Sequence, residues 1–124
     1  MTPTTFQNQN IKISRRIKLN FQGARNKAVD SSYKATVKSI QQAAEQAFGV
    51  QVANTYSDQA TVATYLETDI WPTGYTYTRP VGDATYCVRS PVLRDVTSGN
   101  CTVCTGGVAN YGAGTTYFCA TNLQ

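Results

Sequence analysis

The fold of this chain is decided by residues 24–48, which read ARNKAVDSSYKATVKSIQQAAEQAF. Apolar side chains recur there at steps of three and four, and the positions between them are mostly Lys, Ser, Gln and Glu. This period is typical of an amphipathic α-helix whose apolar face holds Val29, Tyr33, Val37, Ile40, Ala44, Ala47 and Phe48. Gly49 stands where a C-terminal cap belongs. The stretch predicts a helix that must bury one face against a partner.

The residues that follow supply that partner. A short second helix is expected at residues 58–68, capped by Ser57 or Asp58. The chain then becomes rich in Thr, Tyr, Val and Phe, which predicts antiparallel strands at residues 74–78, 85–93 and 115–121. Residues 95–114 are expected to form a long Gly-rich loop between the last two strands.

The order of these elements predicts an α+β fold in a chain of 124 residues, a length that suits one domain. The long N-terminal helix would pack on a small antiparallel sheet of three to four strands, because no other partner is present for its apolar face. The C-terminal loop would be held in place by disulfide bonds.

The front of the chain is basic. The first 38 residues hold eight of the 11 Lys and Arg and one acidic residue, so they carry +7, whereas the remainder carries −3. Residues 1–10 are polar and expected to be irregular, and residues 11–21 suit either a short strand or an extension of the helix. We expect residues 1–20 to be a flexible basic leader, or a segment that is not native to the protein. A solvated leader is favoured over one that binds an anionic surface.

Four cysteines lie in the last 38 residues: Cys87, Cys101, Cys104 and Cys119. An even number in a Gly- and Thr-rich region indicates two disulfides and an oxidising compartment. The Cys101-Thr-Val-Cys104 spacing also allows a redox-active dithiol, or a four-thiolate zinc site with the two outer cysteines. Redox motifs usually open a helix and zinc sites usually use two close pairs, so we expect structural disulfides and no metal or cofactor.

The pairing of the cysteines is open at this point, since four cysteines allow three connectivities. One pairs Cys87 with Cys119 and Cys101 with Cys104. A second pairs Cys87 with Cys101 and Cys104 with Cys119. The crossed connectivity, which joins Cys87 to Cys104 and Cys101 to Cys119, is the least expected.

No group of residues indicates an enzyme. The chain has no His, no Gly-rich phosphate loop, no Ser-centred nucleophile motif and no paired carboxylates. The chain has eight Tyr, among them Tyr75, Tyr77, Tyr86 and Tyr117 on predicted strands. Such aromatic residues beside Arg79, Arg89 or Arg94 can stack nucleic-acid bases or contact another surface. Cross-strand pairing within a sheet is the more ordinary role of such aromatic residues and is favoured.

Several passages, taken in order, resemble the type IV pilin family. Residues 21–28 (FQGARNKA) resemble the point where the long helix of a pilin leaves its membrane-spanning half. Residues 65–77, which end in WPTGYTY, are similar to the pilin passage from the helix into the first strand. Residues 86–88 (YCV) and 117–119 (YFC) resemble later pilin strands and the disulfide-bounded loop. The resemblance covers residues 21–124.

The resemblance implies a single pilin-like domain at residues 21–124. It implies a structural subunit of a cell-surface filament, serving assembly, adhesion or twitching motility, with copies of itself or other pilins as partners. Contact with a host surface or DNA is a further expectation. The alternatives are a DNA-binding minor pilin used in DNA uptake and a pseudopilin of a type II secretion system. Pilins begin with an apolar membrane segment; residues 1–20 are not apolar, so we expect no membrane span here. The expected location is extracellular, after a precursor stage anchored in the inner membrane.

Overall fold

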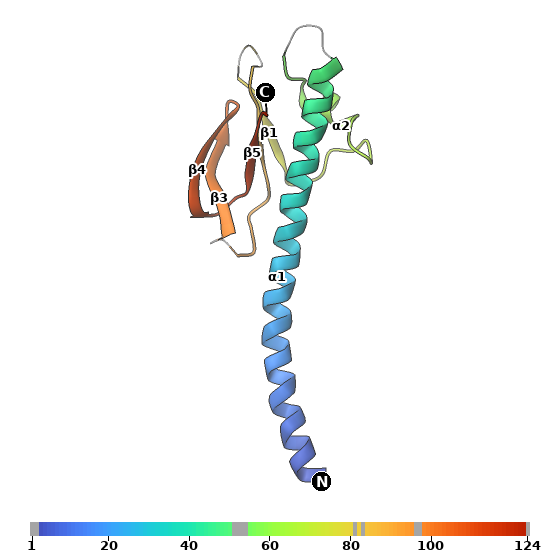
Figure 1. Cartoon of the computed structure of the whole chain (residues 1–124), viewed down its shortest axis with the longest axis vertical. Helices are drawn as coiled ribbons and strands as arrows, with labels where there is room; N and C mark the ends of the chain where they lie inside the picture. The colour runs from blue at the N-terminus through green and yellow to red at the C-terminus, as the bar shows by residue number, and fades with distance from the viewer. Residues whose placement is uncertain (1–2, 51–54, 81, 83, 96–97, 124) are drawn as a thin grey trace.

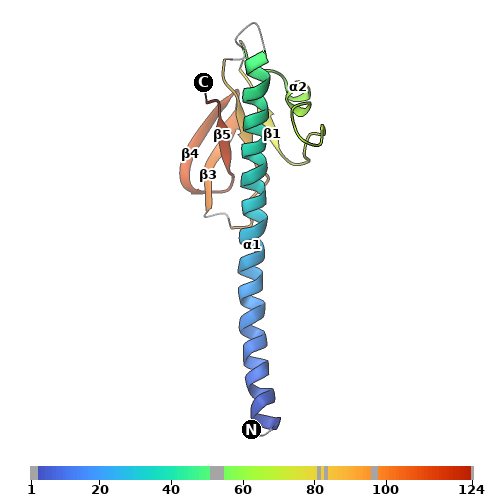
Figure 2. The ribbon, with the colours of Figure 1, turned by 45° about the vertical axis from the view of Figure 1, so that its right-hand side comes forward.

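One long helix carries the rest of the protein near its C-terminal end in the computed structural model (Figures 1 and 2). The structure describes residues 3–50, 55–80, 82, 84–95 and 98–123. Helix α1 runs from Pro3 to Val50, and its 48 residues measure about 72 Å at 1.5 Å per residue. Its C-terminal half lies beside the sheets and α2, whereas no other described element lies beside its N-terminal half (Figure 1).

The helix predicted at residues 24–48 is confirmed, and it is longer at both ends. Val37, Ile40 and Ala44 of its apolar face are buried in the cluster that includes the sheet residues Tyr77 and Val88, and Ala43 and Ala47 are buried as well. Gly49 lies inside the helix and does not have the positive φ of a cap, so the cap expected there is wrong. Residues 11–21 follow the helical alternative, and residues 3–10 are helical where irregular chain was expected.

Helix α2 (Gln59–Ala63) begins at the expected cap but is shorter than the predicted 58–68 helix. The Asp58 side chain accepts a hydrogen bond from the backbone N–H of Thr61 at 2.8 Å. Hydrogen bonds to Thr61 hold the pKa of Asp58 below its usual value. After α2 the chain continues in turns to Trp71, whose indole N–H donates to the carbonyl of Tyr75 at 3.0 Å.

The three predicted strands are confirmed in place but are shorter than expected. They are β1 (Thr76–Thr78), β2 (Cys87–Arg89) and β5 (Cys119–Thr121), and they form an antiparallel sheet in the order β1-β2-β5. In the central register Val88 of β2 lies opposite Tyr77 on one side and Ala120 on the other.

The expected loop at residues 95–114 is wrong, because most of it is a β-hairpin. Strands β3 (Gly99–Thr105) and β4 (Val108–Thr115) pair antiparallel as a separate two-stranded sheet. The turn between them is Gly106-Gly107, with φ of +55° and +75°. Two-residue hairpin turns need positive φ at these positions, which glycine adopts without strain. A two-residue Gly-Gly connection is typical of a hairpin turn.

The protein thus has three layers: α1, the β1-β2-β5 sheet, and the β3-β4 hairpin (Figure 1). Alternation along the central strands divides the core into two clusters. Val88 and Ala120 join the cluster that includes α1, together with Tyr56, Tyr77 and Tyr86. The second cluster consists of the four cysteines, with Ala109 and Tyr117 packed against it. The α+β class is confirmed, with three strands in the sheet that covers the helix.

Candidate functional site

The four cysteines join the β1-β2-β5 sheet to the hairpin. Cys87 lies on β2 and Cys119 on β5, while Cys101 and Cys104 both lie on β3. The disulfides are Cys87–Cys104 and Cys101–Cys119, with Cα–Cα distances of 5.7 Å and 5.9 Å. All four residues are buried. The hairpin, which has little apolar core of its own, is therefore held by two covalent bonds to neighbouring strands.

This is the crossed connectivity, so the two pairings favoured from the sequence are wrong. In the sheet register Cys119 lies opposite Arg89, which makes it a diagonal neighbour of Cys87. Diagonal positions are about 7–8 Å apart, beyond the usual Cα–Cα span of a disulfide. Cys101 and Cys104 are three residues apart on one strand, about 10 Å, and cannot bond to each other.

A β-bulge explains how one strand presents both of its cysteines to the sheet. Positions three apart on a regular strand face opposite sides. In β3 the register shifts between Cys101, which lies opposite Tyr111, and Val103, which lies opposite Asn110. The extra residue turns Cys104 to the side of Cys101, and both become buried, while Val103 is exposed. This irregularity cannot be read from the cysteine spacing.

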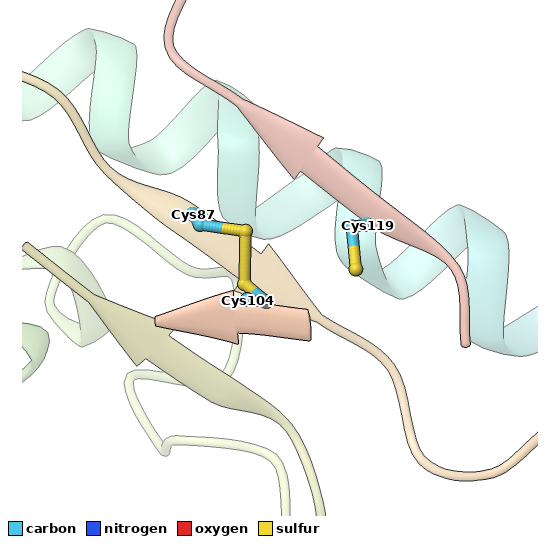
Figure 3. A group of neighbouring side chains, drawn as sticks. All are labelled: Cys87, Cys104 and Cys119. Carbon is cyan, nitrogen blue, oxygen red and sulfur yellow. A yellow bond between two sulfur atoms is a disulfide. The ribbon is translucent and has the colours of Figure 1, made fainter. Parts of the chain in front are cut away.

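The sulfur atoms of Cys87, Cys104 and Cys119 lie within 4.8 Å of one another (Figure 3). The spacing of these sulfur atoms resembles that of a metal site. However, cysteine binds metals as a thiolate, and these sulfur atoms are bonded in disulfides. The redox reading of Cys101 and Cys104 also fails, since the two are not bonded to each other and lie on a strand. The cluster is a structural cross-link.

The three arginines named as possible contacts lie at different places along the chain that forms and leaves the sheet. Arg79 follows β1, near the end of β2 that holds Cys87, and its guanidinium donates to the carbonyl of Tyr56 at 2.7 Å. Arg89 lies at the other end of β2. The side chain of Arg94 is exposed beyond the sheet, and its backbone N–H donates to Asp30 on α1.

Arg89 is the arginine most closely tied to the cysteine layer. It shares the sheet face of Cys87 and Cys119, as the alternation of β2 and its register with β5 require. Its guanidinium stacks over the Tyr117 ring at 4.4 Å from the centroid. Its Nε is buried and has no hydrogen-bond partner among the described atoms. Arg89 therefore covers the edge of the cross-linked layer.

Of the tyrosines predicted on strands, Tyr77 and Tyr86 are buried in the core, and Tyr75 and Tyr117 are half-buried. The Tyr86 ring packs against Tyr56 at 4.6 Å and against Tyr77 at 5.5 Å between centroids. Its hydroxyl donates to a carboxylate oxygen of Glu45 at 2.8 Å. The structural interpretation of these aromatic residues is confirmed for Tyr77 and Tyr86, and Tyr75 packs edge-on against Tyr33 of α1.

Asp30 ties the chain that leaves β2 to the long helix. Its side chain is 3% exposed, and its two oxygens accept the backbone N–H groups of Arg94 at 2.7 Å and Asp95 at 2.9 Å. Sequence reasoning treated Asp30 as a lone acidic residue in a basic stretch. The sequence shows only that Asp30 is the one acidic residue among many basic ones. The backbone groups that it binds are more than 60 residues away, so they could not be inferred.

Two sets of charged residues lie on different elements of the described structure. On α1, Lys27 and Lys38 are exposed and Lys34 is half-buried, with its ammonium 5.7 Å from the Phe118 ring centroid. On the connection that follows α2, Glu67 and Asp69 are exposed. The spacing of the lysines at positions 27, 34 and 38 is helical and could have indicated that they share one side of α1.

No protein-family model, curated protein or solved structure matched this chain. Within the described part of the chain, no helix has the length and apolar character needed to cross a membrane.

Proposed function

We propose that this protein is a structural subunit of a cell-surface filament of the type IV pilus kind, serving assembly, adhesion or motility rather than catalysis. The observation that carries the proposal is the extension of α1 beyond the rest of the molecule (Figure 2). The described buried residues of α1 all lie between Asp30 and Ala47, so only part of this 48-residue helix serves the core.

The part of α1 that extends beyond the core lacks packing partners within the described part of the chain. Isolated helices gain little stability in water, and most helices in proteins are stabilised by tertiary packing. Neighbouring copies can supply that packing for the N-terminal half of α1. An α+β head on the end of a long helix is also the layout that the pilin resemblance implies. In sequence, residues 1–20 are basic, whereas the corresponding segment of pilins is apolar.

The cross-linked head supports an extracellular location. Two buried disulfides form and persist in oxidising compartments, and each stabilises a small domain by roughly 2–4 kcal/mol. That stabilisation suits a subunit which is exposed to the surroundings of the cell and cannot be replaced easily once assembled. A pseudopilin of a secretion system would share this layout and would form a short, piston-like assembly.

A second candidate is a DNA-binding subunit, favoured by the lysines of α1. Lys27, Lys34 and Lys38 lie on one side of the helix, at spacings of seven and four residues. Binding to phosphates would weaken steeply as salt rises. An affinity for duplex DNA that falls sharply between about 50 mM and 200 mM salt would support this candidate, and no affinity at low salt would remove it.

The proposal is tested by antibody labelling of intact cells. Antibodies raised against the purified protein, with gold-labelled secondary antibodies, are expected to decorate filaments that leave the cell surface in electron micrographs. Cells that lack the gene serve as the control. Label confined to short patches at the envelope would favour the pseudopilin, and label confined to the cell interior would contradict the proposal.

A further inference from the structure

Helix α1 has three faces in its C-terminal half. Val37, Ile40 and Ala44 mark the face that packs on the sheet. Ser39, Gln42, Ala43 and Gln46 mark a second face, which lies against Tyr65, Leu66 and Glu67 of the connection after α2 and lines a shallow hollow of about 200 Å³. At about 100° per residue, the third face is centred about 110° from each of the other two.

The third face is basic between residues 27 and 38; farther along the helix it carries Glu45, whose carboxylate accepts hydrogen bonds from Tyr86 and Tyr56. Lys27, Lys34 and Lys38 project within an arc of about 40° on this side of the helix. Lys27 and Lys34 also line a hollow with Ser31 and Asp95, and the buried carboxylate of Asp30 at its floor is already occupied by two backbone N–H groups. We call Lys27, Lys34 and Lys38 the lysine face.

The connection after α2 is acidic. The sequence has no Lys or Arg from residue 49 to residue 78, and it holds Asp58, Glu67 and Asp69 there. The last two are exposed and flank apolar surface, since Ile70 is 70% exposed and Tyr65 is 38% exposed. We call Tyr65, Glu67, Asp69 and Ile70 the acidic patch.

We propose that the lysine face of one copy binds the acidic patch of the next copy. This inference rests on the proposed filament function and names the contact between subunits. The charges are opposite, and neither surface can pair with itself. Because the two surfaces lie on different sides of α1, a contact between them is heterologous and can repeat from copy to copy without closing. A repeating, open contact is what a filament needs.

The charges and the apolar residues have different roles in this contact. Exposed ion pairs add little affinity, but they steer association and exclude like-charged partners. Ile70 and the ring of Tyr65 provide the apolar centre, and the methylene stems of the lysines provide surface for them to contact. Association is therefore expected to weaken as salt rises.

The test exchanges charges between copies. Variant A carries Lys27→Glu, Lys34→Glu and Lys38→Glu, and variant B carries Glu67→Lys and Asp69→Lys. Asp58 is left unchanged because it caps α2. Self-association is measured by sedimentation velocity at low salt, about 50 mM. Each variant alone is expected to associate about tenfold more weakly than the wild type, and an equimolar mixture of A and B is expected to recover association, since both contacts in an alternating chain again join opposite charges.

A matched charge reversal away from both surfaces is the control. Arg25→Glu with Arg94→Glu reverses two exposed charges that belong to neither the lysine face nor the acidic patch, and it is expected to leave association unchanged. Circular dichroism confirms that each variant is folded. Duplex DNA is titrated in parallel.

The outcomes are distinct. Association that is equal in the wild type, A and B overturns this contact, while labelled filaments on cells would still uphold the proposed function. Loss in A and B without recovery in their mixture also overturns it. A wild type that does not self-associate, but binds DNA through the lysine face, overturns it in favour of a nucleic-acid partner.

Discussion

At the residue scale, Glu45 of α1 accepts hydrogen bonds from two tyrosines of the core. Its carboxylate accepts hydrogen bonds from Tyr86 at 2.8 Å and from Tyr56 at 3.2 Å. Burial of the ring, and then the hydrogen bond to Glu45, raise the pKa of Tyr86 far above its usual value near 10. Tyr86 therefore stays protonated in the folded protein at pH values where an unfolded tyrosine ionises.

The stability that Tyr86 contributes depends on pH, because the pKa of Tyr86 is higher in the folded state than in the unfolded state. Above about pH 10 the unfolded state loses the Tyr86 proton and the folded state keeps it, so the stability from Tyr86 is complete below pH 10 and falls as pH rises. We expect Tyr86→Phe to cost roughly 1–2 kcal/mol at pH 8, because a hydrogen bond to a carboxylate is lost. The difference in the free energy of unfolding between the wild type and this variant should be smaller by about 1.4 kcal/mol at pH 11.

Urea unfolding at the two pH values, with disulfides intact, measures this difference. Tyr111→Phe is the matched control, since Tyr111 is 52% exposed and its hydroxyl makes only a long contact of 3.4 Å with Thr121. A difference for Tyr86→Phe that does not change with pH would contradict the assignment.

Replacing two glycines by alanine should have opposite effects on stability. A Cβ on Gly107 would lie 2.4 Å from Cδ of Pro80, and Gly107 has a φ of +75°. We expect Gly107→Ala to destabilise the protein by about 1–3 kcal/mol. Gly23 is exposed within α1 with no atom within 4 Å of an added Cβ, so Gly23→Ala should stabilise the helix by about 0.5–1 kcal/mol. Thermal unfolding compares the two, and equal effects would contradict the hairpin turn.

At the element scale, the sequence predicts the regular parts better than the irregular ones. The helix at residues 24–48 repeats its apolar period many times, and β1, β2 and β5 lie in segments with many Thr, Tyr, Val or Phe residues, so their places were predictable. The hairpin was not, because β4 (Val108–Thr115) contains two glycines and few β-branched residues. The crossed disulfides were missed for a related reason: the β3 bulge, which no residue pattern marks, decides where Cys104 points.

The crossed connectivity makes a prediction that separates all three pairings. In Cys104→Ser the unpaired thiol should be Cys87. A bond between Cys104 and Cys119 would instead leave Cys119 free, and a bond between Cys101 and Cys104 would leave Cys101 free. The protein is denatured at low pH, which suppresses disulfide exchange, and is then alkylated and mapped by mass spectrometry. Cys119→Ser is the companion variant, and its label should fall on Cys101; label on Cys104 would contradict the structure.

At the scale of the whole molecule, the chain divides into a cross-linked head and a helical extension. The +7 charge of the first 38 residues was evident from the sequence, but it did not show whether that part is a loose leader or a continuous helix. The sequence names Arg79, Arg89 and Arg94 as possible contacts with nucleic acid or another surface, and it does not show that Arg79 and Arg89 lie near opposite ends of β2. The basic residues of α1 define a surface only when it is known which side of the helix packs on the sheet and which packs on the connection after α2.

The continuity of α1 beyond the head is the claim on which the proposed function and subunit contact depend. The most direct measurement is a distance between spin labels at positions 8 and 46, attached through unnatural amino acids so that the four cysteines are untouched. A continuous helix predicts a narrow distribution near about 57 Å, at about 1.5 Å for each residue step between them. A broad distribution at clearly shorter distances would show a flexible leader and contradict the account.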